Sequence, residues 1–242
     1  MVLFNQEFDE IKESNNPDKI NDFVIKLSKN PNKEQFKYLE YFIDNLNTQI
    51  LDKVKLNLIF ALGEAGNLNL IEEKYLNFLH KTYHHSDRWV RNEIIQAIDK
   101  ISKKSKLNEK IIVLIGNVLN DDYTPIKINA LKVLLNLKQV PDLIFKNIFR
   151  VLNSKDSAVV EGCRRVLKHL DISKLFSLLN QLDNYKILKQ RAIRSLLIIQ
   201  FKSIINLESF REMILSSNWI DSYRLNYLKE IDTFQRIIAK NL

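Results

Sequence analysis

The sequence predicts an all-α protein whose helices stack in pairs as a solenoid. The first observation behind this is the scarcity of turn residues. The 242 residues include four glycines and four prolines, about 3% of the chain against a usual value of roughly 12%. Sandwiches, barrels and doubly wound sheets use many more turn glycines. The other two observations are a long-range repeat of apolar residues and a helical spacing of apolar residues within each repeat.

Apolar residues that open a helix recur at nearly regular intervals. The anchors lie 36, 36, 33, 29 and 35 residues apart, and they are Val54, Val90, Ile126, Val159, Leu188 and Tyr223. A period in this range is typical of helical repeats, because one helix pair cannot cover its own apolar face. The anchors therefore predict stacked helix pairs.

A second, shorter amphipathic segment lies between successive anchors. In 33–46, Phe36, Leu39 and Phe42 recur at three-residue steps, as on one face of a helix. The other such segments are 69–83, 107–119, 141–152, 173–182 and 206–215. Together with an amino-terminal pair at about 1–13 and 17–29, they predict about seven helix pairs.

Helix ends are marked by prolines, capping carboxylates and glycines. The prolines near helix starts are Pro17, Pro31 and Pro141, and the predicted capping residues are Asp87, Asp156 and Asp221. Proline loses nothing at a helix start, where its missing N–H would be unpaired, and a carboxylate there accepts free backbone N–H groups. Gly63 and Gly66 predict a helix end at 62–66.

The segment 86–101 resembles the HEAT repeat. It carries Asp87, Val90 and Arg91 as D-x-x-V-R followed by apolar residues, and Ala130, Cys163 and Ala192 occupy the small-residue position of related segments. The resemblance implies one right-handed α-α superhelix over 1–242, with the second helix of each pair on the concave side. A capping pair is expected at 1–32, repeats over 33–205 and a closing pair at 206–242. HEAT-like arrays are mostly binding scaffolds.

The net charge of +8 is unevenly distributed. Residues 1–73 hold eight lysines, no arginine and thirteen acids, a net charge of −5, whereas residues 146–202 hold twelve basic and four acidic side chains, a net charge of +8. Such asymmetry favours an anionic partner. A coding bias toward Lys, Asn and Ile explains scattered lysines equally well, but it does not account for the arginine clusters.

Helical spacing leaves basic side chains on the exposed flank of three consecutive second helices. They are Lys127, Lys132, Arg164, Arg165, Lys168, Lys189 and Arg194. Stacking would merge them into one basic stripe. We therefore expect a non-catalytic scaffold or adaptor, a subunit of a complex, that docks an acidic protein segment along this stripe. Trp89, between two arginines, is a further candidate anchor for the partner.

Two alternatives use the same basic surface. One is a nucleic-acid-binding protein that contacts the phosphate backbone and reads little sequence. The other is an enzyme, because some HEAT-like proteins are alkylpurine DNA glycosylases, and Trp219 with Asp221 is faintly similar to their aromatic and carboxylate motif.

Other candidate chemistry is sparse. Cys163 occupies an apolar helix face without a nearby histidine, and His80 and His84 lack the glutamate of the H-E-x-x-H pattern. We expect no catalytic centre, cofactor, metal or small-molecule substrate. No apolar run approaches the roughly 18 residues of a membrane span, and the first residues do not resemble a secretory signal. The sequence therefore predicts a soluble, cytoplasmic protein.

Overall fold

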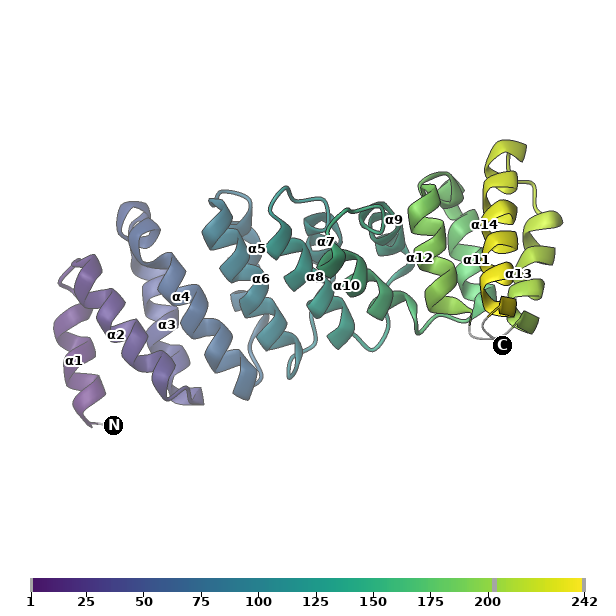
Figure 1. Ribbon diagram of the computed structural model, residues 1–242. Helices are drawn as coiled ribbons and strands as arrows, with labels where there is room; N and C mark the ends of the chain where they lie inside the picture. Colours follow the sequence, from purple (N-terminus) through teal and green to yellow (C-terminus); the bar gives the residue numbers. More distant parts are fainter. Residues whose placement is uncertain (1, 202–203, 241–242) are drawn as a thin grey trace. The chain divides into compact units, whose positions relative to one another are not determined.

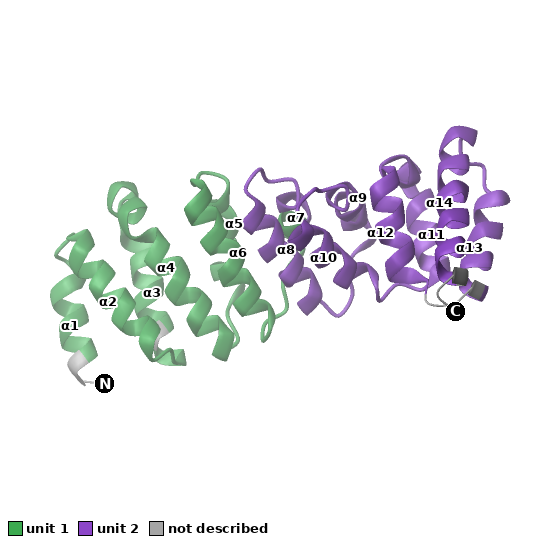
Figure 2. Cartoon of the chain, in the orientation of Figure 1, with its two compact units in different colours: residues 1–115 green, residues 116–242 purple. Residues whose placement is uncertain are grey.

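The computed structural model describes residues 2–201 and 204–240. Over these residues it consists of fourteen α-helices and two short 3-10 helices, without any strand (Figure 1). The prediction of an all-α fold built from helix pairs is confirmed. None of the described helices combines the length and apolar character needed to cross a membrane. The chain forms two compact units, residues 1–115 and 116–242 (Figure 2).

The first unit contains three helix pairs and the start of α7. Its elements are α1 (Val2–Lys12), α2 (Pro17–Lys29), a 3-10 turn (Lys33–Gln35), α3 (Phe36–Asn45), α4 (Thr48–Leu68), α5 (Glu73–Tyr83), α6 (Arg88–Ser102) and α7 (Glu109–Val118), within which the units divide. The second helices form a layer in which α2 packs on α4 and α4 packs on α6.

Polar contacts in this layer join residues one repeat apart. The Nδ2 of Asn57 donates to the Oδ1 of Asn21 at 2.8 Å, and the Nζ of Lys100 lies 2.6 Å from a carboxylate oxygen of Glu64. Both pairs are separated by 36 residues, which equals the first two anchor spacings. The period in the sequence is therefore the period of the packing.

The predicted helix end at 62–66 is wrong, because α4 continues through both glycines to Leu68. A Cβ atom at Gly63 would lie 2.9 Å from the backbone Cα of Ala97 in α6, and one at Gly66 would lie 2.5 Å from a side-chain carbon of Ile101. Both distances are too short for real carbon atoms. The glycines thus allow α4 and α6 to approach closely, and this packing outweighs their low helix propensity.

The second unit continues the same pairing. Its elements are α8 (Thr124–Asn136), α9 (Asp142–Val151), α10 (Ser157–Leu167), α11 (Ile172–Asn180), a 3-10 segment (Gln181–Lys186), α12 (Gln190–Gln200), α13 (Ile204–Leu215) and α14 (Asp221–Lys240). Here α8, α10, α12 and α14 pack in succession as the layer of second helices. The two helices α8 and α10 meet closely where Gly162 faces Leu131.

The register of α12 differs from the prediction. Leu188 is buried but precedes the helix, whose N-cap is Lys189. The buried residues Val159, Val160 and Cys163 of α10 are matched on α12 by a set 33 residues later, Ala192, Ile193 and Leu196. The irregular spacing of 29 residues came from aligning Leu188 with Val159. Ala192 therefore takes the place of Val159 and not that of Cys163.

Candidate partner-binding surface

Three of the predicted basic residues lie exposed on the adjacent helices α8 and α10. Lys132 extends from α8, Arg165 from the last turn of α10, and Lys168 from the C-cap of α10. Arg165 is only loosely paired, since its Nε lies 3.5 Å from a carboxylate oxygen of Glu161. Because the two helices pack on each other, these residues form what we call the basic patch: Lys132, Arg165 and Lys168.

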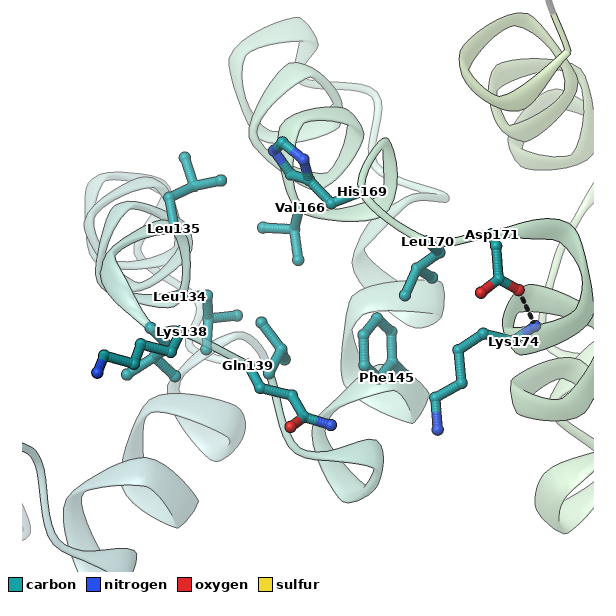
Figure 3. Close-up of a pocket in the computed structure, with 12 residues that line it drawn as sticks. Leu134, Leu135, Lys138, Gln139, Phe145, Val166, His169, Leu170, Asp171 and Lys174 are labelled. Atoms are coloured by element: carbon teal, nitrogen blue, oxygen red, sulfur yellow. Dashed lines mark hydrogen bonds between the residues drawn. The ribbon is translucent and has the colours of Figure 1, made fainter.

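A groove opens next to the basic patch, between the carboxyl-terminal ends of α8 and α10 (Figure 3). It has a volume of about 680 Å³. Leu135 of α8 and Val166 of α10 lie on either side, with Leu134 and Phe145 further in. Leu135 is three residues beyond Lys132, so these two side chains share a face of α8. The groove and the basic patch are therefore continuous.

Charged and polar side chains surround the groove. They are Lys138, Gln139, His169, Asp171 and Lys174. Two of them already have structural roles. The carboxylate of Asp171 caps α11 by accepting the backbone N–H of Lys174 at 2.7 Å, and the Nζ of Lys174 lies 2.6 Å from Asp142. Lys138 and His169, both exposed, add basic character to the mouth.

Of the other predicted residues, two are less suited to contact a partner, whereas Lys189 remains accessible. Lys127 is half-buried on α8. Arg164 is also half-buried, and its Nε is enclosed without a hydrogen-bond partner. Lys189 is exposed at the start of α12, where its backbone N–H donates to the Oδ1 of Asn153 at 2.8 Å. Lys127 and Arg164 thus offer a partner less exposed surface than the other predicted basic residues.

Arg194 is held by a buried carboxylate. Its guanidinium donates two hydrogen bonds to Glu230 of α14, whose side chain is 1% exposed, and Gln190 donates a third at 2.6 Å. Burial acts to raise the pKa of Glu230, but the hydrogen bonds from Arg194 and Gln190 outweigh it and hold the pKa below its ordinary value. Arg194 therefore joins α12 to α14.

Replacing Arg194 by alanine is expected to destabilise the protein far more than replacing Arg165, because the carboxylate of Glu230 would stay buried without its cation. The folded pKa of Glu230 is lowered, so the pair stabilises the fold above the unfolded pKa and this contribution is lost as the pH falls through the folded pKa. The difference between parent and Arg194→Ala in urea unfolding should hence shrink under acid conditions. A second change, Glu230→Gln, should restore part of the stability. Equal effects of Arg194→Ala and Arg165→Ala would contradict this role.

Comparisons with solved structures identify the architecture. An engineered protein matches with a TM-score of 0.52 at 14% identity, over 96% of this chain and 98% of its own. A designed armadillo repeat protein, YIII(Dq.V1)4CPAF in complex with peptide (KR)4, matches with a TM-score of 0.51 at 15% identity, over 95% and 98%. The chain has the fold of a helical-repeat solenoid. An archaeal HEAT-like repeats protein from Thermococcus onnurineus NA1 is also similar, at 14% identity over 97% of this chain and 98% of its own, with a TM-score of 0.43. No protein-family model and no curated protein matches the sequence.

Trp89 of the solenoid belongs to the first unit, whereas the predicted basic residues all belong to the second. Its side chain is 58% exposed at the start of α6. The guanidinium of Arg88 lies 5.0 Å from the centre of the ring. Trp89 is thus an exposed aromatic residue of the first unit, outside the three residues that define the basic patch.

The residues considered for catalysis are buried in the core or paired with a neighbouring side chain. Burial raises the pKa of the Cys163 thiol to about 12, so the nucleophilic thiolate is scarce near neutral pH. Trp219 is 4% exposed, with Tyr185 and Phe176 stacked on it, and Asp221 pairs with Arg224. In the described part of the chain, no three His, Cys, Asp or Glu side chains are grouped to hold a metal ion.

Sequence reasoning missed the groove and the partner of Arg194. Leu135 and Val166 are 31 positions apart, and nothing local indicates that they face each other across a space. Glu230 carried a weak signal, because it is the only acid among Tyr227, Leu228 and Ile231 on the apolar side of the last helix. A carboxylate in such a stripe requires a cation from a neighbouring helix.

Proposed function

We propose that the solenoid is a non-catalytic scaffold that binds an acidic segment of a partner protein through the basic patch on α8 and α10. The observation that carries this proposal is that Lys132, Arg165 and Lys168 are exposed on two adjacent helices, and that in the described part of the chain their one ion pair is the loose contact of Arg165 with Glu161. Side chains so exposed gain little from intramolecular pairs, and they remain available to a partner of opposite charge.

The type of partner is inferred from charge and shape. A designed armadillo repeat protein of similar fold was solved with the peptide (KR)4, so an array of this kind can bind a peptide. The basic patch has the same positive charge as that peptide, so it would repel such a ligand and favours an acidic one. Phosphate groups of nucleic acid are the competing anion, and the peptide and duplex DNA are therefore compared directly in the test below.

Reversing the basic patch with Lys132→Glu, Arg165→Glu and Lys168→Glu should weaken binding of a fluorescent peptide of alternating glutamate and serine by about tenfold or more. Fluorescence anisotropy at low salt measures this, and the parent's affinity should fall as salt is added. The thermal unfolding curve should change little, since exposed positions rarely cost more than about 0.5 kcal/mol each.

The matched control reverses the exposed Lys19, Lys29 and Lys33 in the first unit, with the same change in net charge. If both triple variants bind the peptide equally weakly, the loss of affinity follows from net charge alone, and the basic patch is refuted as the binding site. Tighter binding of duplex DNA than of the peptide, abolished by the same reversal, would assign the surface to nucleic acid instead.

A further inference from the structure

The groove between α8 and α10 has an apolar interior. Leu134, Phe145 and Val166 line it, each less than one-tenth exposed. Leu135, at 38% exposure, extends the apolar lining to the surface. Figure 3 shows Gln139 reaching into the lower part of the same space. A volume of about 680 Å³ accommodates a bulky side chain and its neighbouring backbone.

The charges around the mouth of the groove determine which residues can flank that bulky side chain in a bound segment. Two helices end at the groove, α8 and α10, and two begin there, α9 and α11, so their terminal partial charges oppose one another. The net charge at the mouth of the groove therefore depends on the side chains there. Asp171 and Lys174 are engaged as described above, and Lys138 with the nearby Lys168 leaves the mouth basic.

We infer that the groove receives one bulky apolar side chain of the acidic segment, so that the solenoid recognises an aromatic residue or leucine flanked by carboxylates. This inference rests on the proposed function, which the basic patch alone supports. The carboxylates would lie over Lys132, Lys138 and Lys168. The apolar side chain would move out of water into the groove, beside Leu135 and Val166. Burial of the apolar side chain adds affinity that added salt does not remove.

The test compares two fluorescent peptides with identical glutamates that differ only in a central phenylalanine or serine. The parent should bind the phenylalanine peptide roughly tenfold more tightly, as expected for burying one aromatic side chain. Two groove variants should abolish this preference. Gln139→Trp fills the space from an exposed position, and Leu135→Asn removes an exposed part of its apolar wall.

Both groove variants should bind the serine peptide as the parent does, which also shows that they are folded. A preference for phenylalanine below about threefold in the parent, or its survival in either groove variant, would overturn the inference while leaving the proposed function intact. Failure of the parent to bind either peptide would refute the proposed function itself. Reversing the charges of the basic patch should weaken the binding of both peptides, while the preference for the phenylalanine peptide is retained.

Discussion

Replacing Val90 by aspartate should lower the free energy of unfolding by about 3–5 kcal/mol, because the change removes a buried apolar side chain and puts a carboxyl group without a partner in its place. Val90 is 6% exposed in the first turn of α6. For a chain of this length, the loss corresponds to a shift of roughly 10 °C in thermal unfolding, and circular dichroism measures it.

The neighbouring substitution Trp89→Asp is the matched control. It introduces the same carboxylate in the same turn, but at a side chain that is 58% exposed. A carboxylate at a helix start is electrostatically favourable. A loss of stability seen only in Val90→Asp is therefore caused by burial of the carboxyl group. Similar melting curves for Val90→Asp and the parent would refute the assignment of Val90 to the core.

Replacing Trp219 by alanine should cost about 3–5 kcal/mol of stability, as is typical when a large aromatic side chain is deleted from a core. The ring of Tyr185 stacks on Trp219 with centres 4.5 Å apart, the ring of Phe176 stacks at 5.7 Å, and Tyr227 meets it edge-on at 4.9 Å. The indole N–H donates to the side-chain oxygen of Asn180. Three elements of the second unit, α11, the 3-10 segment and α14, are joined through this one side chain.

Urea unfolding measures this loss, with Trp89→Ala as the control of identical chemistry at an exposed site. The control should cost no more than about 1 kcal/mol, because little apolar surface is buried there. Trp219→Phe should retain part of the stability, since a ring still fills the stack but the hydrogen bond to Asn180 is lost. A loss for Trp219→Ala as small as that for Trp89→Ala would contradict its structural role.

The helices themselves were predictable from short stretches of sequence. Asp87 caps α6 as expected, because its carboxylate accepts the N–H groups of Trp89 and Val90 at 2.8 and 3.0 Å. Asp156 caps α10 in the same way. These signals depend on residues two or three positions apart, and the apolar steps along each helix are equally local.

The candidate site was predictable only in part. Exposure of Lys132, Arg165 and Lys168 follows from helical spacing on a single helix, and the structure agrees. The single stripe required the helices to stack in a known register, and that register was misread at Leu188, which precedes α12. Arg194 was correctly placed at the surface, but its pairing with Glu230 depends on a helix 36 positions further along.

Local sequence thus determined where helices form and which side of each is apolar, because propensity, capping and periodicity act within a few residues. Tertiary structure decided what those helices meet. The two glycines in α4 indicate a helix end when only their neighbours in sequence are considered, yet they continue the helix because the backbone of α6 lies against them. The groove likewise exists only because the ends of α8 and α10 are brought together with α9 and α11, which supply the residues that line it. Both features depend on contacts between residues about one repeat apart, and the energies of such contacts are not encoded in any local pattern. Tertiary packing therefore determined them.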